Sequence, residues 1–202
     1  MGRSPEINRR MRKERRDKIL SAALRLFASQ GLAATTLGHI AERAHMSQGL
    51  AYHYFPSKEA IYLELLAGAF RRMNQAARAL ETLPIPAREK ISRAIAELVA
   101  GLARNEDTAR YHLLIAQASA SDATPRSAQA LIRRQRKVPY AVMARVLRAG
   151  QRDGSVRKGD PAELSLVFWA LVRGLAIHRA AWGKGCRLPR PAALASIFLT
   201  GE

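Results

Sequence analysis

Apolar residues recur at three- and four-residue intervals along most of this chain, and this periodicity limits the folds open to it. A clear case is the stripe formed by Ile19, Ala22, Ala23, Leu26 and Phe27, which falls on one face of a helix. No convincing run of alternating apolar and polar residues, the pattern of a half-buried strand, is present. The sequence therefore predicts an all-α fold.

Capping residues and prolines divide the chain into about nine helices. The predicted helices cover about 12–29, 37–44, 48–53, 58–80, 87–104, 107–119, 125–152, 161–182 and a last one after residue 191. Pro139 lies inside the seventh, where we expect a kink or a break because proline lacks a backbone N–H and its ring crowds the preceding turn.

Local sequence also predicts where several helices begin and end. Gly31 is expected to stop the first helix, and Thr36, Ser47 and Ser57 are expected to cap the next three. Asp160 is followed by a proline and, three positions on, by a glutamate, which together predict a capping box with proline at the first helical position.

Composition excludes several classes of protein. A single cysteine, Cys186, rules out an intrachain disulfide framework and a Cys₂His₂ zinc finger. No uninterrupted stretch of 18 apolar residues is present, and residues 1–16 lack the apolar segment of a secretory signal. We therefore expect a cytoplasmic protein without a membrane partner.

The charge points to a polyanionic partner. The chain has 34 Lys and Arg residues against 16 Asp and Glu, a formal net charge of +18. Basic residues are dense in the first 18 positions, so we expect residues 1–12 to form a flexible basic arm, ahead of a smaller domain at residues 13–62 and a second, larger domain at residues 63–202.

Two short helices joined by a three- or four-residue turn, at about 37–53, have the pattern of a helix-turn-helix motif. The second helix of such a pair enters the major groove and presents its N-terminal residues to the bases. Here those residues are Ser47, Gln48 and Gly49, and the Gln48 side chain can pair bidentately with adenine.

Residues after the predicted reading positions are suited to phosphate contacts. Hydrogen bonds to the DNA backbone are expected from Tyr52, His53, Tyr54 and Lys58. Lys58 stands at a helix start, where the helix dipole disfavours a cation, and a phosphate at the same helix end would explain its presence.

The segment from Arg16 to Leu66 resembles the DNA-binding domain of the TetR family of bacterial transcriptional regulators. The resemblance is strongest at Ser47-Gln-Gly and at Tyr52-His-Tyr-Phe-x-Ser-Lys-Glu. It implies DNA contacts by Thr36, Ser47, Gln48, Gly49, Tyr52, His53, Tyr54 and Lys58. Two positions depart from the family pattern: His45 replaces a common glycine in the turn, and Ala51 replaces a larger aliphatic residue.

The remainder of the chain resembles the family in layout only. That layout implies a small-molecule effector pocket and a homodimer, with a double-stranded DNA operator as partner and release of the operator on ligand binding. The helix at 161–182 supports dimerisation through about residues 160–200 independently, because it is apolar almost all round. The candidate pocket residues are Phe70, Met73, Tyr111, Tyr140, Met143 and Trp169.

Functions other than a ligand-responsive repressor have less support in the sequence. Neither an enzyme nor a metal or cofactor site is expected: no acid, base or nucleophile set converges, and His39, His45 and His53 lack helical ligand spacing. A basic helical protein that binds nucleic acid or anionic surfaces without sequence preference remains the alternative.

Overall fold

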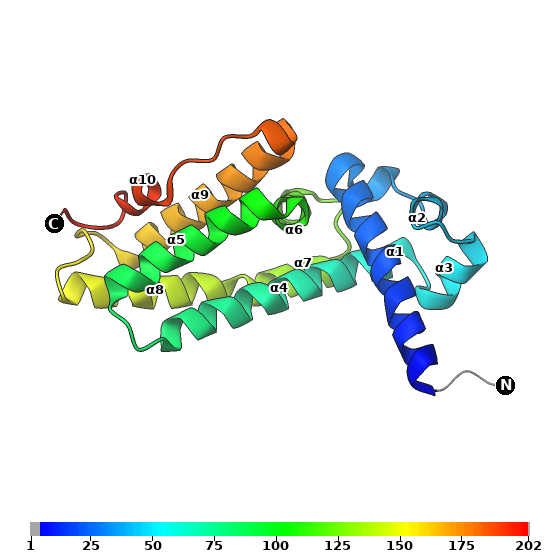
Figure 1. Ribbon diagram of the computed structural model, residues 1–202, viewed down its shortest axis with the longest axis horizontal. Coiled ribbons are helices and arrows are strands. Elements are labelled where there is room, and N and C mark those ends of the chain that lie inside the picture. The colour runs from blue at the N-terminus through cyan, green and yellow to red at the C-terminus, as the bar shows by residue number, and fades with distance from the viewer. Residues whose placement is uncertain (1–4, 202) are drawn as a thin grey trace.

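The computed structural model describes residues 5–201, and α-helices account for most of them (Figure 1). The helices are α1 (Pro5–Ala34), α2 (Leu37–Arg43), α3 (Gln48–Tyr54), α4 (Lys58–Thr82), α5 (Ala87–Arg104), α6 (Glu106–Ala120), α7 (Arg126–Gln135), α8 (Lys137–Arg152), α9 (Pro161–Trp182) and α10 (Pro191–Ala195). The described residues contain no β-strand, and one isolated bridge joins Val156 to Leu199. The predicted all-α fold is confirmed.

The helices form two bodies that share α4 (Figure 1). The N-terminal domain consists of α1–α3, and the C-terminal domain consists of α5–α10. Ile61, Leu66 and Phe70 of α4 pack in the same core as α1 and α2, whereas Ala77 and Leu80 pack against the core of the C-terminal domain. The predicted boundary between residues 62 and 63 therefore falls within a continuous helix.

Residues 5–12, predicted to be part of a flexible arm, are helical. They extend α1 toward the N-terminus, and the first four residues lie outside the described range. The segment is rich in arginine, and its Arg10 guanidinium pairs with the Glu14 carboxylate at 2.9 Å. Arginine, glutamate and lysine favour helix, and pairs spaced i,i+4 add to that preference. The net positive charge led us to expect an arm, although the local propensities favour a helix.

The expected interruption near Pro139 is present, but it precedes the proline. Separate helices α7 and α8 meet at Arg136, and Pro139 occupies the first turn of α8. A proline in a first turn is tolerated because the N–H it lacks has no partner within the helix there. This break raises the number of α-helices in the described residues from the expected nine to ten.

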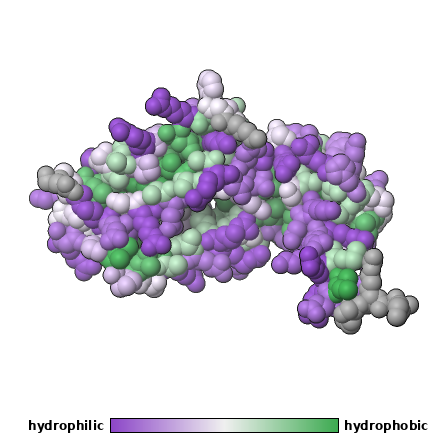
Figure 2. Space-filling model, viewed as in Figure 1, coloured by the Kyte–Doolittle hydropathy of each residue, from purple (hydrophilic) through white to green (hydrophobic). Residues whose placement is uncertain are grey.

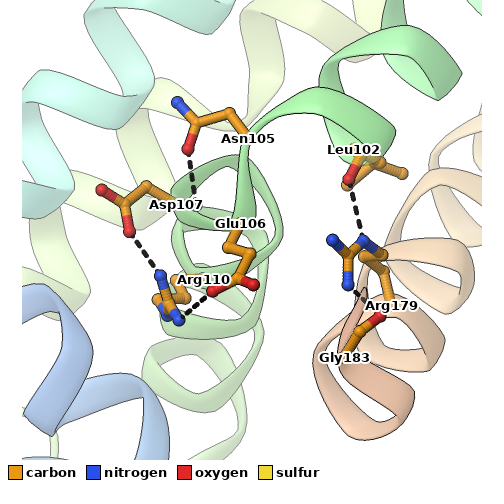
Figure 3. Close-up of polar contacts among 7 residues, drawn as sticks. All are labelled: Leu102, Asn105, Glu106, Asp107, Arg110, Arg179 and Gly183. Atoms are coloured by element: carbon orange, nitrogen blue, oxygen red, sulfur yellow. Dashed lines mark hydrogen bonds and ion pairs between the residues drawn. The ribbon is translucent and has the colours of Figure 1, made fainter. Parts of the chain in front are cut away.

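Helix α6 connects the two domains. It packs against α9 on one side and α1 on the other, and the Gln117 side chain donates a hydrogen bond to the Ala28 carbonyl at 3.3 Å. Figure 3 shows how the start of α6 is fixed. The Asn105 side chain caps it, and the Arg110 guanidinium pairs with Glu106 at 2.6 Å and Asp107 at 2.7 Å.

The buried Arg179 holds the end of α9 to the same region (Figure 3). Its guanidinium donates to the carbonyl of Leu102, near the end of α5, at 3.1 Å and also to the carbonyl of Gly183. A charged donor can be buried when carbonyl oxygens replace its water. The contacts around α6 therefore join α1 of the N-terminal domain to α5 and α9 of the C-terminal domain.

Candidate nucleic-acid interface and ligand cavity

The turn between α2 and α3 has the geometry that a helix-turn-helix requires. The Met46 N–H donates to the Ala41 carbonyl at 2.9 Å and the His45 N–H to the Glu42 carbonyl at 3.0 Å, which is a Schellman arrangement. His45 has φ = 56°, the left-handed conformation that favours glycine. The departure from the family pattern at this position is thus accommodated at some cost in backbone strain.

Helix α3 has one buried side and one exposed side. Ala51 is fully buried, and Phe55 just after the helix is also buried, so both hold α3 against the N-terminal core. Gln48, Tyr52 and His53 are exposed on the other side. Gly49 is exposed too, and a Cβ added to it would meet nothing within 4 Å, so the backbone is open to a close approach here.

The two predicted contact residues with aliphatic hydroxyl groups, Thr36 and Ser47, are also helix caps. The Thr36 hydroxyl oxygen accepts the His39 N–H at 3.1 Å, and the Ser47 hydroxyl oxygen accepts the Leu50 N–H at 3.3 Å. A hydroxyl that accepts in this way retains its own O–H as a donor. Thr36 and Ser47 are both exposed, so each can cap its helix and donate a hydrogen bond outward.

A basic groove lies beside the start of α3. It has a volume of about 530 Å³ and runs between α1 and the α2–α3 turn. Its positively charged residues are Arg15, Lys18, Arg25 and Arg43, and His45 also lines it. None of the described residues that line it is acidic. Arg25 and Arg43 could not be selected from the sequence pattern, because only the fold brings them next to α3.

Tyr54 and Arg16 connect the end of α3 to the core. Tyr54 is half-buried, and its ring lies edge-on to His53 with 5.4 Å between centroids. The Arg16 guanidinium stacks over the Phe55 ring at 4.3 Å and pairs with both carboxylate oxygens of Glu64. Arg16 therefore supports the placement of α3 from within the domain, and it does not line the groove.

Lys58, predicted from the sequence to contact a phosphate, is half-buried and bonded within the protein. Its ammonium donates to three main-chain carbonyls, those of Leu32 at 2.9 Å, Ala33 at 3.2 Å and Thr35 at 2.8 Å. These carbonyls follow Gly31, which has φ = 78° and ends the regular part of α1 as predicted. An ammonium has three N–H donors, and all three are used here. In the DNA-free protein Lys58 thus has a structural role, since the cation compensates the carbonyl end of α1.

The C-terminal domain contains a cavity with two adjoining chambers. The apolar chamber, of about 340 Å³, is lined by Met73, Tyr111, Met143 and Trp169 among others. The second chamber, of about 460 Å³, is lined by Phe70, Met73, Tyr140 and Trp169 among others. All six residues proposed from the sequence as pocket candidates thus line one chamber or both.

His112 lies between the chambers and was not among the residues selected from the sequence. It lines both, together with Met73, Ile115 and Trp169. Burial, and secondarily the positive charge of Arg173, lower the pKa of His112 from 6.5 to about 4. The imidazole is therefore neutral at physiological pH and can donate one hydrogen bond and accept another.

This lowered pKa predicts acid sensitivity. Between pH 6.5 and 4 the unfolded chain binds a proton at His112 and the folded protein does not, so stability is retained above pH 6.5 and lost as the pH falls toward 4. We expect the free energy of unfolding to fall by about 2 kcal/mol more between pH 7 and pH 5 in the parent than in His112→Gln. Urea unfolding across this range measures the difference, and parallel curves would contradict the prediction.

Comparison with known protein sequences identifies the N-terminal domain. The sequence profile described as "Bacterial regulatory proteins, tetR family" matches residues 19–65. The transcriptional repressor KstR of Rhodococcus jostii (strain RHA1) is 38% identical over 69 residues, 34% of this chain and 32% of the repressor. The transcriptional regulator BetI of Rhizobium meliloti (strain 1021) is 35% identical over 78 residues, 39% of this chain and 38% of that protein. Both alignments span well under half of each relative.

Solved structures extend the likeness to the whole fold. The crystal structure of the MbdR regulator from Azoarcus sp. CIB superposes with a TM-score of 0.78 at 25% identity, covering 90% of this chain and 95% of that one. The family resemblance of residues 16–66 is confirmed, and the arrangement of the C-terminal helices is shared as well. The N-terminal domain therefore matches the TetR family of bacterial regulatory proteins over residues 19–65, and the chain as a whole has the fold of the MbdR regulator.

Proposed function

We propose that the protein is a ligand-responsive transcriptional repressor that binds a palindromic DNA operator as a homodimer in the cytoplasm. The observation that carries this proposal is the exposed side of α3 next to the basic groove. Exposed Gln48 supplies base recognition, and a groove with four cationic side chains and no acidic lining residue suits a phosphate backbone. The related KstR carries the name of a transcriptional repressor.

The proposed DNA contacts differ from the initial set by one loss and several additions. Thr36, Ser47, Gln48, Gly49, Tyr52, His53 and Tyr54 are retained. Lys58 is omitted because its ammonium is bonded within the protein. Arg15, Lys18, Arg25 and Arg43 are added as phosphate contacts, since they line the groove that adjoins α3.

A second copy of the chain is proposed to cover the outer side of α9. One side of this helix packs against α6 and α8. The other side exposes Leu166, Val167, Ile177 and Trp182, the last with 70% of its surface open. Figure 2 shows hydrophobic patches among the hydrophilic side chains of the larger domain. Large apolar side chains left exposed along one helix are consistent with an association site.

The apolar character of α9 admits one other interpretation. The helix is long and apolar enough, by composition, to cross a membrane, and 33% of its most apolar stretch is buried. The helix packs against α6 and α8, and it occurs within the fold shared with the MbdR regulator. Both observations favour a subunit interface over a lipid contact. In this proposal no membrane partner and no catalytic role are assigned to the chain.

The proposed sequence recognition is tested with Gln48→Ala. Selection from random double-stranded DNA is expected to enrich a palindrome in the parent protein, and the substitution should cost about 1–3 kcal/mol on that site with little change on unrelated DNA. Gln75→Ala, which alters an exposed glutamine of α4, is the matched control. An unchanged specific-to-nonspecific ratio would exclude Gln48 as a base reader. Failure to enrich any palindrome would favour the non-specific basic protein.

A further inference from the structure

Among the described residues, three of the four Lys and Arg side chains that line the cavity gather in its second chamber, and the fourth, Arg72, lines the first, where it stacks over the Tyr111 ring. The second chamber is lined by Arg136 and Lys137, where α7 meets α8, and by Arg173 of α9. None of the described residues that line this chamber is aspartate or glutamate. Three cationic side chains from two separate parts of the chain therefore face the same chamber.

Arg173 is the most enclosed of the three. It is half-buried, whereas Arg136 and Lys137 are exposed. Among the described residues no carboxylate lies within ion-pair distance of it, and its guanidinium lies 5.8 Å from the centroid of the Tyr140 ring. Burial, and then the charge of Arg136, lower the pKa of Arg173, which is the effect expected of uncompensated positive charge.

Other arginines of the same domain have acidic partners. Arg110 bonds to two carboxylates at 2.6 and 2.7 Å, and Arg145 bonds to both oxygens of Glu81 at 2.6 and 2.9 Å. Ion pairing is thus available in this fold, whereas Arg173 has no carboxylate partner among the described residues. A buried cation of this kind favours a negatively charged ligand.

The apolar chamber supplies a place for an uncharged ligand body. Its lining includes Met73, Leu80, Leu98 and Phe168, and its one acidic lining residue, Glu97, is already paired with Arg93 at 2.8 Å. The two chambers adjoin, because Met73 and Trp169 are among the residues that line both. One molecule can therefore place an apolar part in the first chamber and a charged part in the second.

We propose that the effector is an amphipathic organic anion whose charged group binds Arg173, with Arg136 and Lys137 beside it, and whose apolar body fills the first chamber. This inference rests on the proposed function, because it names the chemical class of the effector. A guanidinium binds a carboxylate, sulfonate or phosphate through two parallel hydrogen bonds. The neutral imidazole of His112, which lines both chambers, can add one more hydrogen bond to the anion.

A pair of fluorescent probes tests the charge preference. 1-Anilinonaphthalene-8-sulfonate and N-phenyl-1-naphthylamine share their aromatic body and differ by the sulfonate, and both brighten in apolar cavities. We expect the sulfonate to bind the intact protein at least about tenfold more tightly than the neutral amine. Equal affinities, a preference for the amine, or binding of neither probe would overturn the proposal.

Substitutions assign the preference to the cavity. Arg173→Gln is expected to weaken sulfonate binding by about tenfold and to leave amine binding unchanged. Arg136→Gln, at an exposed position, should produce a smaller loss and provides a second variant if Arg173→Gln does not fold. Arg134→Gln is the control. Arg134 lies near the end of α7 but outside the cavity lining, so its substitution should change neither affinity. Equal losses for both probes, or none in either cavity variant, would contradict the assignment.

A separate measurement distinguishes failure of this inference from failure of the proposed function. Operator binding and its release by the sulfonate are followed by fluorescence anisotropy of labelled DNA. A protein that selects no palindrome but retains the Arg173-dependent preference contradicts the proposed function alone. A protein that binds its operator but shows no preference for the sulfonate contradicts the inference alone.

Discussion

Replacing Lys58 by methionine is expected to lower the free energy of unfolding by about 3 kcal/mol, since hydrogen bonds to a charged group contribute about 1.5–3 kcal/mol each and part of this is regained from water. The ammonium bonds to the carbonyls of Leu32, Ala33 and Thr35, and methionine keeps the length of the side chain but supplies no donor. The carbonyls that follow α1 then lose their partner. Urea unfolding of the DNA-free protein measures the loss.

A structural role and a phosphate contact for Lys58 predict different salt dependences. If the ammonium remains on the carbonyls, the residual folded Lys58→Met protein should bind operator with the same dependence of affinity on salt as the parent. A phosphate contact would reduce that slope by about one. Lys13→Met, which removes an exposed lysine of α1, should leave the unfolding free energy unchanged. A stable variant with a shallower slope would restore the phosphate interpretation.

Two aspartates on the outer side of α9 are expected to produce a monomer and to weaken operator binding by at least about 100-fold, because two linked reading helices bind far more tightly than one. The substitutions are Val167→Asp and Ile177→Asp, at exposed apolar positions of the proposed interface. Charges buried between two subunits would lack partners, so association becomes unfavourable. Light scattering at micromolar concentration and operator titration measure the two effects.

The control for this experiment adds the same charge elsewhere. Ala79→Asp with Ala130→Asp changes exposed positions of α4 and α7, and we expect a dimer with nearly the parent affinity for DNA. If both double variants weaken binding equally, the cause is the added negative charge and not loss of the dimer. A parent protein that is monomeric under these conditions would contradict the proposed interface directly.

The features that the sequence predicted well are those set by neighbours in the chain. Thr36, Ser47, Ser57 and Asp160 all cap helices through their side chains, as their positions before apolar runs predicted. The left-handed conformation of His45 occurs at the turn position where the family pattern commonly has glycine. Each of these outcomes depends on groups within about four residues, which the linear sequence displays.

The features that the sequence did not predict depend on contacts between distant segments. Lys58 finds its carbonyl partners 23 to 26 residues earlier in the chain, so a helix-start rule alone could not locate them. Arg43 joins Arg15 and Arg25 only when α2 folds against α1. His112 faces the cavity because α6 packs between α1 and α9, an arrangement that periodicity does not specify.

The sharing of α4 between the two cores bears on how regulators of this kind can be recombined. The core of the N-terminal domain includes Leu114 and Ala118 of α6 and Ala128 and Ile132 of α7, in addition to the first half of α4. A hybrid that joins residues 1–62 to a foreign effector domain would replace these α6 and α7 side chains. The core of the N-terminal domain would then be packed by residues of different size and shape. Operator specificity is therefore better changed by substituting exposed residues of α3, because those substitutions leave the buried contacts between the two domains of this protein intact.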